Sequence, residues 1–293
     1  MNPTTDTTTG STATNTAGST ATATATAGRH ASGPTGSAAL TTPAGRLLAL
    51  ARAELTLLGR AKGTLFAALF VPLVVPFTMK SAVKNMDLDG TGLSIGSVLL
   101  PSAVAFSLLF AVYSALVSVY AARREELVLK RLRTGEVRDV EILAGAALPS
   151  VAIGLVQSLV LMGMCAALLD VGAPGAAHYV VLGLVLGLVM FPLLAAVTSI
   201  VSRSVESAQV MVMPLLFASM LGSGVVLPLE VMPDKLASVC ELLPLSPVIA
   251  LIRGGWTGEL GAGEGLRAVL IAVAWIALGV FAVKRWFRWE PRR

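Results

Sequence analysis

The chain has 293 residues, of which 55% are apolar and only 13% are charged, and its net charge is +5. Soluble domains usually carry about 25% charged residues, so this composition argues against a water-soluble globular protein and indicates one that faces lipid. Nucleic-acid-binding proteins gather basic and aromatic side chains on a soluble face, but only 5% of this chain is aromatic, so we expect no nucleic-acid partner.

The N-terminal region divides into two parts before the first apolar run. Residues 1–42 are mostly Thr, Ala, Ser and Gly and cannot bury enough apolar surface to fold, so we expect a disordered tail. Residues 43–62 mix leucines with four basic side chains, which predicts a helix lying at the cytoplasmic membrane surface. The remaining residues, 63–290, are predicted to form one transmembrane domain.

Six runs without a charged residue follow along the chain, and about 20 helical residues cross a bilayer core. Because backbone groups exposed to lipid must bond internally, each run is expected to be a helix. The sequence therefore predicts an all-α polytopic membrane protein with six transmembrane helices. The predicted spans are 63–79, 97–122, 142–169, 179–201, 209–227 and 268–283.

An even number of spans places both termini on one side of the membrane, and basic residues indicate which side. If the termini lie inside, the inner segments hold 17 Lys and Arg residues and the outer segments hold 5, with nine acidic residues inside and eight outside. Positive residues concentrate in cytoplasmic loops, so both termini are predicted to be cytoplasmic. This topology and the anionic bilayer account for the net positive charge.

The most charged stretch lies between the second and third spans. Residues 123–141 carry eleven charged side chains, and acidic residues are interleaved with basic ones. Three leucines and a valine share the predicted short helix with these charges, and Thr134 and Gly135 end it. Two interpretations stay open from the residues alone: a basic anchor at the membrane surface, or an amphipathic helix that binds a groove on a soluble partner.

This loop resembles the one that follows the second span in permease subunits of ABC-2-type exporters. That family typically has R-E, then L-K-R-L-R, a small turn, and V-x-x-x-E-x-L-x-G. Leu127 and Val128 replace the usual Gly-Thr, and Glu136 and Ala146 stand where Pro and Lys are common. The matching residues are Arg124, Glu125, Leu129, Lys130, Arg131, Leu132, Arg133, Val137, Glu141 and Gly145.

A second stretch, residues 222–256, is similar to the region after the fifth span in the same family. There S-G, a P-L-x-x-x-P turn, a short amphipathic helix, L-P-L and a later Arg recur in order. Proline breaks a straight helix, so the residues independently predict short re-entrant helices at the outer surface. The matching residues are Ser223, Gly224, Pro228, Pro233, Leu243, Pro244, Leu245 and Arg253.

The resemblance implies that the loop is a coupling helix seated in a separate ATP-binding cassette subunit. The chain has no G-x-x-x-x-G-K-[ST] phosphate loop, so ATP and Mg are expected in that partner, and no cofactor is expected here. A second permease, either a copy or a paralogue, is implied as well. The residues expected to couple to the ATPase are Arg124, Glu125, Leu129, Lys130, Arg131, Leu132, Arg133, Thr134, Gly135 and Val137.

The predicted function is a non-enzymatic permease subunit of an ATP-driven exporter in a bacterial cell membrane. The predicted spans hold no ionisable side chain, which weakens a proton-coupled or sodium-coupled mechanism. The cargo suggested is a drug, an antibiotic or another hydrophobic compound, as in multidrug efflux and antibiotic resistance. Export of a lipid or glycolipid is the alternative, and so is a non-transporting membrane anchor for a cytosolic partner.

Few residues within the spans could act on cargo. Gln157, Thr198 and Ser199 are candidates for a cargo path, although polar residues in spans more often join helices. The two cysteines, Cys165 and Cys240, have no metal-binding or disulfide spacing, so we expect no metal site. No catalytic residue is expected.

Overall fold

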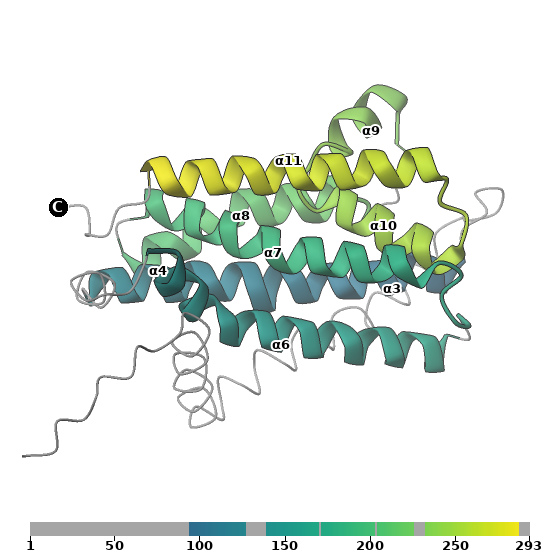
Figure 1. Ribbon diagram of the computed structural model, residues 1–293, viewed down its shortest axis with the longest axis horizontal. Helices are drawn as coiled ribbons and strands as arrows, with labels where there is room; N and C mark the ends of the chain where they lie inside the picture. Colours follow the sequence, from purple (N-terminus) through teal and green to yellow (C-terminus); the bar gives the residue numbers. More distant parts are fainter. Residues whose placement is uncertain (1–93, 127–138, 170, 203, 226–231, 287–293) are drawn as a thin grey trace, which may run out of the picture. The chain divides into compact units, whose positions relative to one another are not determined.

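The structure is a computed structural model that describes five ranges of the chain: 94–126, 139–169, 171–202, 204–225 and 232–286 (Figure 1). Within these ranges every regular element is a helix. They all belong to one compact unit, Thr41–Arg293. The predicted tail at 1–42, the interfacial helix at 43–62 and the first span at 63–79 lie outside the described residues.

Five helices in the described ranges are long and apolar enough to cross a membrane. This confirms the all-α polytopic fold, while the predicted span at 63–79 falls outside the described part of the chain. The first of the five is a continuous helix, Ile95–Glu125, made of three consecutive elements. The others are α6 (Asp139–Leu168), α7 (Ala177–Val201), α8 (Val205–Gly222) and α11 (Ala262–Trp286).

The continuous helix Ile95–Glu125 forms the centre of the described bundle. It begins as α3 (Ile95–Phe106), where Ser94 and Ser97 exchange side-chain and backbone hydrogen bonds in a capping box. It becomes a π-helix, η1 (Ser107–Ser114), and continues as α4 (Ala115–Glu125). Parts of this helix pack against α6, α7, α8 and α10, so most of its side chains are buried.

The spans alternate in direction, which gives the described unit two distinct ends (Figure 1). The end of α4, the start of α6, the α7–α8 corner and the end of α11 lie at one end. We call this the loop end, because residues 127–138 connect its helices there. The start of α3, the end of α6, the start of α7, the end of α8 and the start of α11 lie at the opposite end. This alternation is what consecutive membrane spans require, and the side that faces the cytoplasm stays a prediction.

Apolar side chains cover the outer faces of the peripheral helices. Val156 and Leu159 on α6, Val210 on α8 and Leu270 and Phe281 on α11 are each more than half exposed in the isolated chain. Contiguous apolar surface of this kind marks contact with lipid or with another protein. The chain is therefore a multi-pass membrane protein.

The fifth and sixth predicted spans differ most from the boundaries drawn on the sequence, while the other described spans agree to within about three residues. The run at 209–227 was predicted as the fifth span, but α8 begins at Val205 and ends at Gly222, where Ser223 and Gly224 follow with non-helical backbone. Gly224 has a φ of 77°, a conformation that glycine adopts without steric strain. The last span extends beyond the predicted 268–283, because helix α11 continues through charged residues at both of its ends.

Two short helices occupy the region between α8 and α11. Helix α9 (Asp234–Cys240) has Pro233 as its N-cap residue, and α10 (Ser246–Thr257) has a proline in its first turn. At 1.5 Å per residue, the 12 residues of α10 are too short to cross a bilayer. Helix α10 is largely buried and packs against α7 and α3 at the opposite end of the bundle. The prediction of short helices in this region is therefore confirmed for α10.

Glycines allow α10 to approach α7 closely. A β-carbon on Gly183 of α7 would lie 2.9 Å from Cβ of Leu251 on α10, and one on Gly187 would lie 3.3 Å from Cγ1 of Val248 on the same helix. Spacing of this kind brings helices into contact, as small residues do at membrane helix interfaces. The G-x-x-x-G of α7 therefore packs within this chain.

Candidate functional site

Most of the predicted coupling loop lies outside the described residues. The structure describes the chain up to Glu126 at the end of α4 and again from Asp139 at the start of α6. The loop residues proposed to bind the ATPase therefore stay a prediction. Those outside the described ranges are Leu129, Lys130, Arg131, Leu132, Arg133, Thr134, Gly135 and Val137.

Arg124 is described, and its side chain points into the bundle. Only 1% of Arg124 is exposed, whereas the next residue, Glu125, is exposed. Its Nη1 donates to the carbonyl of Ser199 at 2.6 Å, and its Nη2 donates to the carbonyl of Ser202 at 2.5 Å and to the Ser202 hydroxyl at 3.1 Å. We call this arrangement of Arg124, Ser199 and Ser202 the Arg124 cap.

The Arg124 cap satisfies a general need of helix α7. The last carbonyls of a helix have no partner within the helix, and the helix dipole makes this end negative. Ser199 lies in the last turn of α7, and Ser202 is its C-cap residue, so a guanidinium supplies both donors and positive charge there. The Ser202 hydroxyl adds a hydrogen bond of 2.8 Å to the Ser199 carbonyl.

Helix α8 starts directly after this cap. Ser202 is followed by Arg203, outside the described residues, and then by Ser204, the N-cap residue of α8. Ser204 and Ser207 form a capping box, in which the backbone N–H of Ser204 donates to the Ser207 hydroxyl at 2.8 Å. The corner between α7 and α8 is therefore short, and both helix ends at the corner are capped.

Helix α4 also bonds to two other helices near the loop end. The Tyr120 hydroxyl donates to the carbonyl of Leu143 on α6 at 3.1 Å. Nε2 of Gln209 on α8 donates to the hydroxyl of Ser118 at 2.8 Å. With the Arg124 cap, these bonds connect the last turns of α4 to α6, α7 and α8.

The three candidate cargo residues take part in contacts between or within helices. Gln157 is 1% exposed, and its Oε1 lies 3.5 Å from the Ser107 hydroxyl of η1. The hydroxyls of Thr198 and Tyr113 share a hydrogen bond of 3.0 Å. The Ser199 hydroxyl donates to the Ala196 carbonyl of its own helix at 2.7 Å. A role of these residues in a cargo path stays a prediction.

The residues of the predicted outer region gather at the opposite end. Arg253 of α10 donates from Nη2 to the Gly224 carbonyl at 3.2 Å, and the hydroxyl of Ser102 donates to the Val225 carbonyl at 2.8 Å. Ser223 is fully buried beside them. Pro233 begins α9, Pro244 lies in the turn before α10, and Pro228 is outside the described residues.

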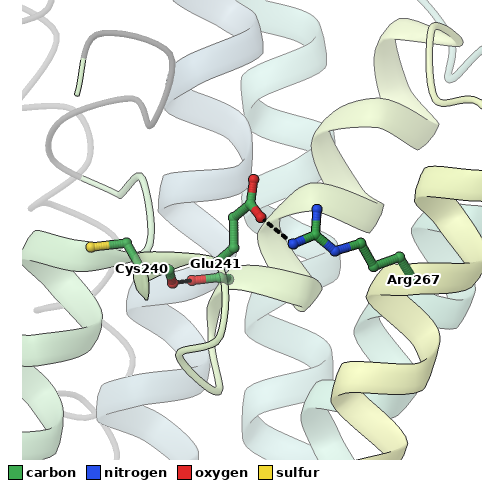
Figure 2. Close-up of polar contacts among 4 residues, drawn as sticks. Cys240, Glu241 and Arg267 are labelled. Atoms are coloured by element: carbon green, nitrogen blue, oxygen red, sulfur yellow. Dashed lines mark hydrogen bonds and ion pairs between the residues drawn. The ribbon is translucent and has the colours of Figure 1, made fainter. Parts of the chain in front are cut away.

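The short helices are also connected to the last span. Figure 2 shows Glu241, at the end of α9, paired with Arg267 of α11. Their Oε2 and Nη2 atoms are 2.7 Å apart, and the Arg267 side chain is 62% exposed and that of Glu241 40%. The Ser246 hydroxyl at the start of α10 donates to the Cys240 carbonyl at 2.5 Å. An exposed ion pair contributes little to stability, so the hydrogen bond of 2.8 Å from the Trp275 indole of α11 to the Leu242 carbonyl is the firmer connection.

The sequence carried a signal for the burial of Arg124 that the loop motif obscured. Residues three or four apart lie on one helix face, and Val117, Tyr120 and Ala121 are all buried ahead of Arg124. Arg124 therefore continues the buried face of α4 instead of starting the exposed loop. Among the described residues, no group of three His, Cys, Asp or Glu side chains could hold a metal ion.

Comparison with known families agrees with this architecture. A family model described as ABC-2 type transporter matches residues 45–256. The match covers the predicted loop and runs through α10. A search of curated proteins found no match to this chain.

Proposed function

The chain belongs to the ABC-2 type transporter family, and we propose that it exports a drug, an antibiotic or another hydrophobic compound using a separate ATP-hydrolysing subunit. Membership makes it a permease component of an ABC transporter, embedded in the membrane and not a catalytic subunit. The family match carries this proposal, because it spans both stretches that resemble ABC-2 permeases and five membrane-spanning helices surround them in the expected order.

An ATPase partner accounts for the charged loop. The chain has no phosphate loop of its own, while residues 123–141 combine leucines with charges of both signs. We propose that this loop faces the cytoplasm of a bacterial cell and binds a groove on the ATPase. Nucleotide binding would then move the loop and shift the bundle between access states.

The spans support cargo that needs no charged partner in the membrane. In the described helices, Asp, Glu, Lys and Arg occur only in the first or last turns, apart from Arg253 of the short helix α10 and Arg267 in the second turn of α11. Ion-coupled transporters usually place ionisable groups near the middle of the membrane. This pattern supports ATP-driven movement of an apolar or amphipathic compound.

The test reconstitutes the tagged full chain with the ATP-binding cassette protein that co-purifies with it, in inverted vesicles. We expect ATP-dependent accumulation of a hydrophobic cationic dye, and we expect the L132D variant to abolish stimulated ATP hydrolysis because a charge would enter an apolar contact. The matched control is L236D, because Leu236 is an exposed leucine on α9 at the opposite end.

Three outcomes would contradict parts of this proposal. Unchanged ATP hydrolysis in L132D, at normal membrane insertion, would contradict binding of the loop to the ATPase. ATP-dependent movement of a fluorescent lipid but not of the dye would assign the chain to lipid export. Co-purification of a cytosolic protein that hydrolyses no ATP would leave a membrane anchor as the function.

A further inference from the structure

Arg124 connects the helix that enters the loop to the corner between two other spans. It lies in the last turn of α4, three residues before the loop segment 127–138. Three of its hydrogen bonds reach residues at or beyond the last turn of α7. A displacement of the end of α4 therefore acts directly on the end of α7.

The Arg124 cap is suited to carrying movement because it is buried and geometrically defined. Arg124, Ser199 and Ser202 are each about 1% exposed, so water does not compete for their hydrogen bonds. Guanidinium donors are held in a rigid plane, and hydrogen bonds made away from water are stronger than exposed ones. The end of α4 cannot move away from α7 without breaking the hydrogen bonds that a buried charge makes to two carbonyls.

The short corner extends this connection to α8. Ser202 is two residues from Ser204, which caps the next helix. A chain this short leaves little room for independent movement of the two helices. The bond between Gln209 of α8 and Ser118 of α4 returns to the same element, nearly two turns before Arg124. Helices α4, α7 and α8 are therefore joined as one group at the loop end.

Burial also separates Arg124 from the loop residues that could meet a soluble partner. A side chain that is 1% exposed offers almost no surface to another protein, whereas Glu125 and Glu126 beside it are exposed. The R-E pair at the start of the loop motif thus divides into one inward and one outward residue. Only the outward one is placed to face the ATPase.

We propose that Arg124 is a positioning residue of the transport cycle, which carries movement of the loop at 127–138 to the corner between α7 and α8 without touching the ATPase itself. The inference rests on the proposed function, because it requires an ATPase that moves the loop. It assigns to Arg124 a task different from the partner contact that the family resemblance implies.

The experiment uses the full chain in complex with its co-purified ATPase in proteoliposomes. It compares R124Q, R124K and the control R123Q, which removes the same charge from a half-buried neighbour. The measurements are the amount of assembled complex, ATP hydrolysis, and ATP-dependent transport of the dye. The ratio of transport to hydrolysis is the decisive quantity, because a residue that only supports folding would lower both together.

For R124Q we expect normal assembly and continued ATP hydrolysis, with transport per ATP reduced about tenfold, within the usual range of coupling between sites. R124K should recover part of the transport, because an ammonium keeps the charge and can donate to these carbonyls without the planar fork. R123Q should resemble the wild type in its transport-to-hydrolysis ratio.

Other results would overturn the inference. Loss of assembly in R124Q at normal membrane insertion would make Arg124 a contact with the ATPase, and an unchanged transport ratio would remove it from the cycle. If R124Q fails to insert into the membrane, the R124K variant is used instead. A transport-to-hydrolysis ratio of R124K equal to that of the wild type then overturns the proposal. A wild-type chain that transports nothing with the ATPase overturns the proposed function and, with it, this inference. An unchanged transport-to-hydrolysis ratio in R124Q, with a transporting wild type, overturns the inference alone.

Discussion

At the scale of single residues, the polar groups within the spans act mainly on one another. Ser107 of η1 donates to the Gly154 carbonyl at 3.2 Å and accepts from the Ser158 hydroxyl at 3.2 Å. Tyr113 of the same element meets Thr198 of α7. Each polar side chain in an apolar environment needs such a partner, since an unsatisfied one is unfavourable by about 1–3 kcal/mol. The central helix is therefore joined to α6 and α7 by matched pairs.

The pair of Tyr113 and Thr198 gives a direct test of this role. Y113F removes one hydroxyl but keeps the aromatic ring that meets Phe191 edge-on. Y113F and T198V should each lower the free energy of unfolding by about 1 kcal/mol, and the double variant should lose little more than either alone. Equilibrium unfolding in mixed detergent micelles measures the free energy of unfolding of each variant. Additive losses, or lost dye transport at unchanged stability, would favour a cargo role for Thr198.

The residue scale also shows what sequence reading could not reach. A pattern of charges identified the loop, and the family resemblance placed Arg124 among the residues expected to couple to the ATPase, without indicating where its side chain points. The deciding contact comes from Ser199 and Ser202, which lie 75 and 78 residues further along the chain. No local pattern reports a partner at that distance, although the helical spacing from Tyr120 to Arg124 indicates the buried face.

At the scale of elements, the helical class and the positions of most spans could be read from apolar runs alone. The exact ends could not, because charged residues can extend a helix beyond its apolar core, as Glu264 and Lys284 do in α11. The π-helical turn of η1 was not predicted either, since hydropathy reports burial and not the hydrogen-bond register. Turns of this kind often occur at functional sites, and this one contains Ser107 and Tyr113, which bond to α6 and α7.

Prolines show the same limit of local rules. Pro101, Pro149, Pro192 and Pro214 all lie inside helices, because neighbouring spans and local adjustments satisfy the backbone groups that a proline frees. Pro233 and Pro247, by contrast, lie at helix starts. The proline rule predicted short helices in the outer segment, but the same rule would wrongly have broken the four spans that contain a proline.

The packing of α10 against α7 provides a prediction at the element scale. A β-carbon on Gly255 of α10 would lie 2.8 Å from the backbone nitrogen of Val180 and 3.0 Å from the Ala176 carbonyl oxygen. G255A should destabilise the chain by about 1–3 kcal/mol, because backbone atoms cannot yield as a flexible side chain can. The midpoint of thermal denaturation in detergent measures this effect.

The matched control is G163A on α6, where an added β-carbon meets nothing within 4 Å. Alanine in a helix interior is favoured over glycine by about 0.5–1 kcal/mol, so G163A should leave the midpoint unchanged or raise it. Equal midpoints for G255A and G163A would show that α10 does not pack on α7 as closely as the structure places it.

At the scale of the whole molecule, the two ends of the bundle differ in character. The loop end holds the predicted coupling loop, the Arg124 cap and the basic end of α11, where Lys284 and Arg285 lie in the last turn. The opposite end holds the short helices α9 and α10. Because basic residues concentrate on the cytoplasmic side, the loop end is expected to face the cytoplasm and α9 the exterior.

This orientation and the predicted span at 63–79 can be tested together by labelling single cysteines with an impermeant maleimide. Cys165 and Cys240 are buried and would be replaced by alanine to remove background. In intact cells, L236C on α9 should react, whereas L132C in the loop should react only after the cells are broken. The reverse pattern would invert the proposed topology and place the loop where no cytosolic ATPase could reach it.

A third cysteine, S37C in the N-terminal tail, decides whether residues 63–79 cross the membrane. Residue 94 precedes the first described span at the end opposite the loop, so one additional crossing must return the tail to the loop side (Figure 1). We therefore expect S37C to react like L132C, only after the cells are broken. The flanking Lys62 and Lys80 can reach the headgroups on either side of this short run. Labelling of S37C in intact cells would show that residues 63–79 stay on the outer side and that the chain has five spans.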